Sequence, residues 1–268
     1  MDQGQRLRRR PDRRLLSRLG RRQADGRQLR RRRLLRTVRL HRRRTPRDGV
    51  RRLDTPAAKG SWISEGDSSN FALHIDNGLR SWEQPGWGGW GGRQVVDPDD
   101  PNRWTNRGAQ DADETGATPR DYAAARWFSA IQNDFAARML WTVKGVDDTN
   151  HQPQACVAQG LDITRRPGQP VVLTPRARDV DGDAVTLTWW QYREAGTYPG
   201  TVELETTGAG TARFRVPADA QPGQTIHLIL EATDDGSPAL THYQRVVVTV
   251  ADQRDAVGRS GPGGCAQN

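Results

Sequence analysis

Hydrophobic and polar positions alternate through the second half of the chain, as expected for β-strands that bury one face. Ile226, Leu228 and Leu230 share one face of such a strand, and turn residues recur about every 8–12 positions. The pattern predicts strands at 161–163, 171–178, 185–192, 202–206, 213–216, 226–233 and 243–250. Short strands at this spacing predict an immunoglobulin-like β-sandwich over residues 151–252.

Two tryptophans, Trp189 and Trp190, are adjacent on the strand predicted at 185–192. Neighbouring side chains on a strand point to opposite faces of the sheet. One indole is therefore expected in the core, and the other on the surface or at an interface.

In the segment that precedes residue 151, apolar residues recur at intervals of three and four positions, which favours a helix. Thr118 is a candidate N-cap, and Pro119 suits the first helical position. Apolar residues then repeat on one face, which predicts a helix over 119–143 packed on a core. A shorter helix is predicted from Ser68 or Ser69 to the Asn77–Gly78 pair, and residues 97–118 are predicted to be an exposed loop.

Residues 59–93 combine tryptophans with glycine, acids and amides. A Gly-rich loop can present indoles as a stacking surface for sugar rings, or press them into the edge of a core; the residues favour the core slightly. The candidate stacking residues are Trp82, Trp87 and Trp90. The candidate polar contacts are Glu65, Asp67, Asn70, Asp76 and Asn77, for which capping and turn formation is the favoured alternative.

The net charge of +9 combines two very different regions. Residues 1–55 hold 22 arginines and five aspartates, 22 − 5 = +17, so the rest carries 9 − 17 = −8. Three interpretations compete: a segment translated out of frame, a basic arm for nucleic acid, and an amphipathic helix for an anionic membrane. The first is favoured, and disorder is expected in each case, because residues 1–55 have little apolar area to bury.

The Asp179, Asp181 and Asp183 carboxylates form a candidate calcium site. An EF-hand is excluded, because its twelfth position would be Trp190. Asp234 and Asp235 would join a shared site if the turns meet at one end of the sandwich. A turn that uses Asp and Gly for their backbone preferences is the favoured alternative, so no cofactor is expected.

The two cysteines and the lack of long apolar runs bear on disulfide formation and membrane insertion. Cys156 and Cys265 flank the predicted sandwich, which leaves both a bridge and two free thiols open, with free thiols favoured. No apolar run is long enough to span a membrane, and no signal peptide follows the first charges.

Three strings carry a family resemblance: EGDSSNFALHIDNGLRSWEQPGWGGWGGR, DYAAARWFSAIQNDFAARMLWTV and NHQP at 150–153. The chain resembles the cellulose-binding family of polysaccharide-degrading bacteria, over about Lys59 to Val250. The resemblance implies an α/β, nucleoside-hydrolase-like part over 56–150 followed by the all-β sandwich. It also implies export to the periplasm or the medium. Residues 253–268 lie beyond the resemblance, and their Gly-rich composition predicts a flexible tail.

The chain departs from the family pattern before Lys59. The early βαβ portion of the hydrolase-like domain is expected there, with an Asp-x-Asp-x-x-x-Asp-Asp cluster, and the Arg-rich segment stands in its place. The chain therefore resembles an N-terminally truncated member that lacks catalytic residues.

The predicted function is non-catalytic binding of cellulose or a related plant polysaccharide. The alternatives are an N-glycosyl hydrolase of the nucleoside type, whose acid cluster is missing here, and nucleic-acid binding by the basic arm. The sequence argues against nucleic acid as the main partner.

Overall fold

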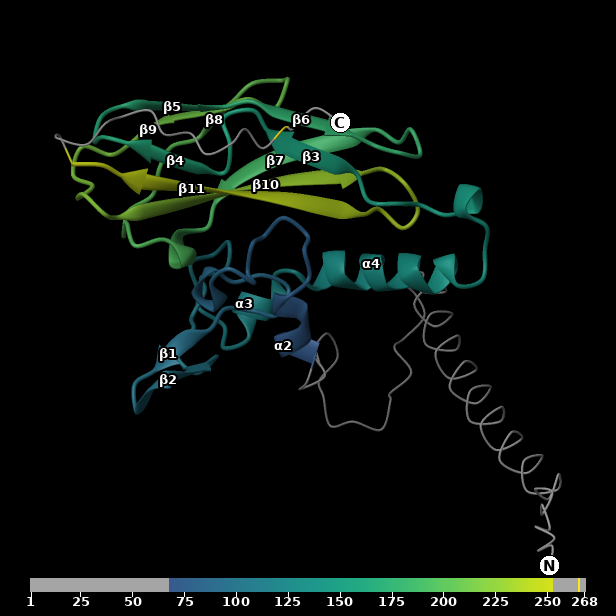
Figure 1. Cartoon of the computed structure of the whole chain (residues 1–268), viewed down its shortest axis with the longest axis horizontal. Coiled ribbons are helices and arrows are strands. Elements are labelled where there is room, and N and C mark those ends of the chain that lie inside the picture. Colours follow the sequence, from purple (N-terminus) through teal and green to yellow (C-terminus); the bar gives the residue numbers. More distant parts are fainter. Residues whose placement is uncertain (1–67, 253–264, 266–268) are drawn as a thin grey trace, which may run out of the picture. The chain divides into compact units, whose positions relative to one another are not determined.

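The computed structural model describes residues 68–252 and Cys265, which belong to one compact unit (Figure 1). The predictions for residues 1–55, and those for Glu65 and Asp67, lie outside the described residues. In the described part, no helix has the length and apolar character needed to cross a membrane.

Most of the regular structure after Asn150 is β-sheet. A four-stranded sheet has the order β4-β11-β10-β7, in which β11 is antiparallel to β10 and parallel to β4. The pair β3-β6 and the three-stranded sheet β5-β9-β8 form a second layer (Figure 1). The strands are β3 (Gln154–Val157), β4 (Asp162–Arg165), β5 (Pro170–Leu173), β6 (Pro175–Arg178), β7 (Val185–Gln191), β8 (Glu205–Thr206), β9 (Ala212–Arg215), β10 (Thr225–Asp234) and β11 (Thr241–Val250).

The main hydrophobic core lies between these two layers. Leu173 of β5 and Phe214 of β9 belong to the same buried cluster as Leu228 and Val248 of the four-stranded sheet. Each fully buried large apolar side chain is worth roughly 1.5–3 kcal/mol, so this core supplies much of the stability. The predominance of β-strands predicted from the alternation is confirmed.

The strands differ in detail from the prediction. Strand β3 was not predicted, and the segment 171–178 is divided into β5 and β6 at Thr174. Strand β5 pairs with β9, whereas β6 pairs with β3, so the chain changes sheets where Pro175 follows Thr174. Proline lacks a backbone N–H and limits its predecessor, which makes it a suitable residue at such a change.

Helices and short loops dominate residues 68–149. The regular elements are α2 (Ser68–Leu73), the 3₁₀-helix η1 (Pro85–Trp87), β1 (Val95–Asp97), β2 (Asp100–Thr105), α3 (Tyr122–Ala125), α4 (Phe128–Trp141) and η2 (Val146–Asp148); η3 (Arg193–Ala195) follows β7. The β1-β2 hairpin begins where Val95 pairs with Thr105, within a region predicted to be mostly loop.

The single helix predicted over 119–143 is two helices in the structure. The chain turns between α3 and α4 at Trp127, which is only 2% exposed. Its Nε1 donates to the Ala123 carbonyl at 3.1 Å, and its ring packs on the outer face of the four-stranded sheet. Burial of this indole therefore accompanies the interruption. The predicted helix to Asn77–Gly78 is also shorter, because α2 ends at Leu73.

Strands β10 and β11 are buried on both faces. Ile229 and Tyr243 point away from the main core and are 0% and 2% exposed. They belong to a second buried cluster with Leu79, Trp90 and Trp127, all from the region before the sheets. The outer face of the sheet thus supplies the apolar surface that the 68–149 region needs.

The segment after α2 runs beside β11. The Tyr243 N–H donates to the Asn77 carbonyl at 2.9 Å, and the Arg245 N–H donates to the Gly78 carbonyl at 3.0 Å. This segment therefore bonds to the first half of β11, as β4 bonds to the second half. Gly78 has φ +87°, and a Cβ there would overlap the Tyr243 carbonyl, so glycine is required.

Candidate functional site

One buried cation fastens the Trp- and Gly-rich loop to the sheet. The Arg245 guanidinium is fully buried and donates from Nε to the Leu79 carbonyl at 2.5 Å and from Nη2 to the Gly88 carbonyl at 2.8 Å. Burial lowers the pKa of Arg245 to about 9, which leaves it charged at neutral pH. Hydrogen bonds from a charged group are stronger than those from a neutral one. Arg245 therefore holds the loop to the sheet at two points, Leu79 and Gly88.

Trp90 is buried beneath this loop and is 5% exposed. Its ring lies edge-on to Tyr243, with 6.4 Å between ring centroids. Trp90 was a candidate stacking residue, and its burial shows that this assignment is wrong. The glycines explain the difference: a Cβ at Gly91 would overlap the Ser69 carbonyl, so only glycine lets the loop press this indole inward. The alternative interpretation, in which an indole closes the edge of a core, is confirmed for Trp90.

Trp87 is held rigidly at the C-terminal end of η1. Its ring lies edge-on to His227 at 5.1 Å, and the Arg80 guanidinium carbon is 5.1 Å from its centroid. Arg80 is itself fixed by ion pairs to Glu83 at 2.7 Å and Asp162 at 3.0 Å. Trp87 is half-buried, so its conformation is set by the protein before any partner arrives.

Two other indoles near η1 are more exposed. Trp82 lies in the turn that leads into η1 and is 53% exposed, and Trp104 on β2 is 38% exposed. A Cβ added at Gly86 would lie 3.5 Å from the Trp104 ring, so that ring rests on the backbone beside Trp87. We call Trp82, Trp87 and Trp104 the indole surface.

Sequence reasoning did not select Trp104. It lies in the segment 97–118 that was predicted to be a loop, but β1 and β2 form a hairpin there. Asp97 and Arg103 stabilise the hairpin with an ion pair of 2.6 Å. A turn-forming run, Asp-Pro-Asp-Asp-Pro, between apolar and aromatic positions was the signal that could have identified the hairpin.

The described polar candidates are dispersed. Asn70 on α2 is exposed and accepts a 3.4 Å hydrogen bond from Gln94, while Asp76 is exposed after the helix. Asn77 is 2% exposed and accepts the Leu79 N–H through Oδ1 at 3.1 Å. Asn77 therefore stabilises the turn and is too buried to contact a ligand.

A buried carboxylate, Asp111, links the loops to the sheet and was not selected from the sequence. It is 0% exposed and accepts hydrogen bonds from Arg93 at 2.8 Å, Arg126 at 3.4 Å and the Tyr192 hydroxyl at 2.5 Å. Burial raises the pKa of Tyr192, which keeps its hydroxyl protonated as a donor. Because both carboxylate oxygens are engaged, Asp111 serves as an internal link.

The two strand tryptophans behave as predicted. Trp189 is 7% exposed in the main core, and its Nε1 donates to the Gly210 carbonyl at 2.8 Å. Trp190 points to the other face, where it packs on Trp127 at 5.8 Å between centroids. It is thus the interface aromatic.

Cys156 of β3 forms a disulfide with Cys265, with 5.1 Å between their Cα atoms. The preference for free thiols was therefore wrong. The side chains of Asp179, Asp181 and Asp183 also come together, with one oxygen of each within 4.8 Å of the others.

Comparisons with known proteins match both parts of the chain. The model of the C-terminal domain of the cellulose-binding protein Sde0182 matches residues 171–250, and the model of the nucleoside hydrolase-like domain of cellulose-binding Sde182 matches residues 50–94. The chain is similar to this cellulose-binding family in both regions. The resemblance predicted from the sequence is therefore confirmed.

A solved structure shares this arrangement. It is a nucleoside hydrolase-related hypothetical protein from Saccharophagus degradans that is associated with carbohydrate metabolism, 28% identical, with a TM-score of 0.56. The match covers 71% of this chain and 48% of that one, so the chain spans about half the length of this related structure.

More distant matches cover about a third of the chain and carry no argument about function. The titin M3 domain is 17% identical over 37% of this chain and 97% of its own, with a TM-score of 0.25. An endo-fucoidan hydrolase of glycoside hydrolase family 107 is 20% identical over 34% of this chain and 12% of its own, with a TM-score of 0.25. No curated protein matches the chain.

Proposed function

We propose that the chain binds a polysaccharide, cellulose or a related plant polymer, without cleaving it. The observation that carries the proposal is the indole surface: Trp82 and Trp104 are exposed, and the Trp104 ring rests on the backbone of Gly86, next to the half-buried Trp87. Flat apolar rings suit the apolar faces of sugar rings, and the indole N–H can serve as a hydrogen-bond donor at the rim.

Rigidity of the indole surface supports this function. Trp87 is fixed by Arg80 and His227, and the Trp104 ring rests on the Gly86 backbone. A surface that is ordered before binding loses less conformational entropy when a ligand stacks on it. Exposed aromatic rings held in this way are suited to an extended, repetitive ligand.

The family similarity supports the class of ligand. Both matching models describe a cellulose-binding protein, and the nucleoside hydrolase-like model ends at residue 94, within the loop that carries two of the three indoles. Cellulose itself, and the absence of cleavage, are parts of the proposal.

Two carboxylates of the 68–149 region, Asp97 and Asp111, are engaged within the protein. Asp97 is 5% exposed and paired with Arg103, and Asp111 is fully buried with both oxygens occupied. Glycoside hydrolysis requires two carboxyl groups that flank the scissile bond, and neither of these acids is free to approach a sugar.

We also propose that the protein acts outside the cytoplasm and that its β-region is immunoglobulin-like. The Cys156–Cys265 disulfide supports the location, because disulfides persist in oxidising compartments. The two-layered arrangement with antiparallel β7, β10 and β11 supports the fold.

A depletion assay tests the function. The full chain and a chain without residues 1–55 are mixed with insoluble cellulose, and the protein left in solution is measured; nucleoside cleavage is assayed in parallel in calcium buffer. We expect both proteins to be depleted equally and neither to cleave nucleosides. Retention of both in solution, or cleavage by either, would contradict the proposal. Depletion that requires residues 1–55 would assign binding to the basic segment instead.

A further inference from the structure

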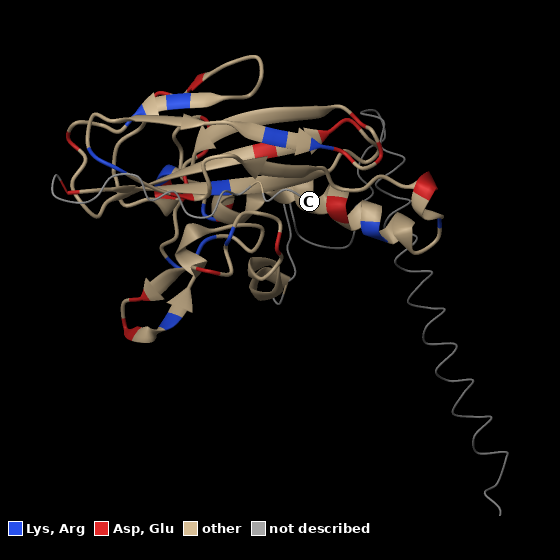
Figure 2. Ribbon diagram, turned by 45° about the horizontal axis from the view of Figure 1, so that its top comes forward, with Lys and Arg blue, Asp and Glu red and all other residues tan. Residues whose placement is uncertain are grey.

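We propose that Asp179, Asp181, Asp183, Asp234 and Asn150 form a calcium site at one end of the β-sheets. Figure 2 shows acidic positions at the turns of this end. The site is separate from the indole surface, and it joins three segments that are distant in sequence.

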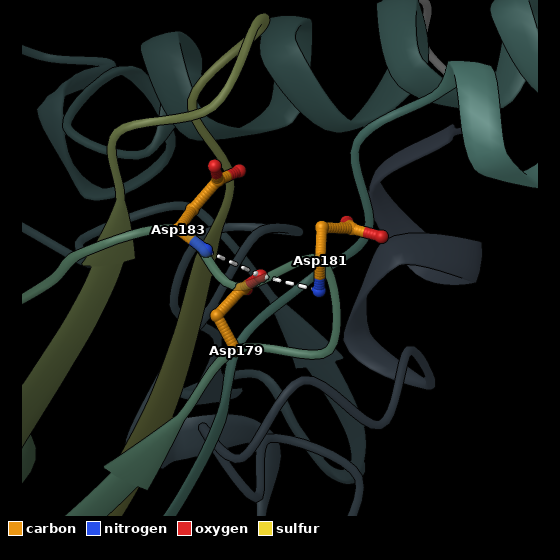
Figure 3. A group of neighbouring side chains, drawn as sticks. All are labelled: Asp179, Asp181 and Asp183. Carbon is orange, nitrogen blue, oxygen red and sulfur yellow. Dashed lines mark hydrogen bonds between the residues drawn. The ribbon is translucent and has the colours of Figure 1, made fainter.

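The first segment is the turn between β6 and β7. Oδ1 of Asp179 accepts the N–H of Asp181 at 2.8 Å and that of Asp183 at 3.3 Å, which folds the turn around this carboxylate (Figure 3). As a result, one oxygen of each of the three carboxylates lies within 4.8 Å of the others. This gathering alone would also suit a simple turn.

The second observation comes from buried oxygens without hydrogen-bond partners. Asp234 at the end of β10 is 3% exposed, and its Oδ1 accepts hydrogen bonds from the Asn150 side chain and from the Gly236 and Leu240 N–H groups. Its Oδ2 is buried and has no partner, and the same is true of Oδ2 of Asp179 and of Oδ1 of Asn150, which is 7% exposed.

Such atoms are costly in a folded protein. A buried acceptor that loses its hydrogen bond costs about 1–3 kcal/mol. Two of these oxygens belong to aspartate side chains and one to an amide carbonyl, and oxygens of both kinds are ligands for hard cations. A cation bound at this end of the sheets would give such oxygens a partner.

Strand pairing places Asp234 beside the acidic turn. Asp234 is the residue opposite Val185 in the β10-β7 ladder, two positions from Asp183. The Ala184 N–H donates to Oδ1 of Asp235 at 2.9 Å, which ties the two turns together.

The third segment closes the site from the other side. The His151 N–H donates to Oδ2 of Asp181 at 2.6 Å, while the preceding residue, Asn150, donates to Asp234 at 2.9 Å. Asn150 therefore lies between the acidic turn and the end of β10. In the described part of the chain, His151 is the only basic residue in an ion pair with these acids.

The ligand set identifies the cation. Four carboxylates and one amide oxygen are hard ligands, and no thiolate takes part. Calcium accepts 6–8 oxygens in flexible geometry, which suits oxygens from three segments together with water, whereas magnesium requires a near-ideal octahedron. Bound calcium would fix the junction at Asn150, where the helical region passes into the sheets.

The test uses the full chain, freed of metal with a chelator and titrated with calcium chloride while its melting temperature is recorded. Dissociation constants of extracellular calcium modules are about 10⁻⁴–10⁻³ M. At about 100 times such a constant, we expect the melting temperature to rise by roughly 5–10 °C. Magnesium chloride at equal ionic strength should give a clearly smaller shift. No calcium shift, or an equal shift with magnesium, would overturn the proposal.

Asp183→Asn provides the matched variant, because it keeps the size of the side chain and removes one ligand charge. We expect it to fold, as judged by circular dichroism, and to weaken calcium binding by at least about tenfold. Asp181→Asn should do the same and serves as the second variant. Asp99→Asn, an exposed acid in the β1-β2 turn, is the control and should keep the full shift. Full shifts in both ligand variants, or a lost shift in the control, would overturn the assignment.

Discussion

Replacement of Trp127 by alanine should destabilise the whole described unit. Trp127 is 2% exposed, and its ring lies 5.8, 6.0 and 5.5 Å from the rings of Trp190, Tyr192 and Tyr243. Removing a buried Trp side chain costs about 3–5 kcal/mol, and the loss of these aromatic pairs places the expected value in the upper half of that range. The free energy of unfolding of a folded protein is only about 5–15 kcal/mol, so this loss would be a large part of it.

The assay is thermal and urea unfolding of Trp127→Ala, followed by far-UV and near-UV circular dichroism. Each kcal/mol shifts the melting temperature of a unit of 150–250 residues by about 2–4 °C, so a cost of about 4–5 kcal/mol should lower it by about 8–20 °C. Both signals should move together, because the helical region and the outer face of the sheet share one cluster. Trp82→Ala, at 53% exposure, is the control and should change stability by no more than about 0.5 kcal/mol. An unchanged transition of the β-sheet signal in Trp127→Ala would refute the shared cluster.

Two further predictions concern the packing of the loop. Gly78→Ala should cost more than about 1 kcal/mol by urea unfolding, because the new Cβ would overlap the Tyr243 carbonyl at a φ of +87°; an unchanged midpoint would disprove the close approach. Burial, then Arg245 and Arg80, lower the pKa of His227 to about 3, so it stays neutral in the fold while the unfolded chain takes up a proton below about pH 6.5. His227 should therefore lower the free energy of unfolding by about 3 kcal/mol as the pH falls from about 7 to about 4. In His227→Gln this part of the pH dependence should be missing, and equal pH dependence in both proteins would contradict the prediction.

The regular elements could be predicted where local pattern and tertiary packing agree. The alternation in 226–233 predicts β10 closely, because its core-facing residues follow the period of two. The burial of the outer face of β10 and β11 was not predicted. Ile229 and Tyr243 become buried there only through contacts with Trp90 and Trp127, which are far away in sequence. Such long-range contacts leave no local periodicity.

The same reason explains the errors at the candidate site. The glycines around Trp90 are compatible with an exposed or a buried indole. The indole is buried because Arg245, more than 150 residues later, binds this loop to the sheet. Burial of apolar side chains from residues 68–149 likewise depends on the outer face of the sheet, although Phe71 remains 72% exposed. Trp104 was missed because its hairpin was assigned to a loop.

The most direct test of the central claim compares binding isotherms on insoluble cellulose. The variants are Trp82→Ala/Trp104→Ala and the control Phe135→Ala, whose side chain on α4 is 38% exposed, as Trp104 is. An aromatic residue central to an interface contributes about 2 kcal/mol or more, so each lost indole should weaken binding by about 30-fold. We expect the double variant to lose measurable binding with an unchanged melting temperature, while Phe135→Ala binds like the unaltered chain. Equal isotherms for the double variant and the unaltered chain would contradict the account.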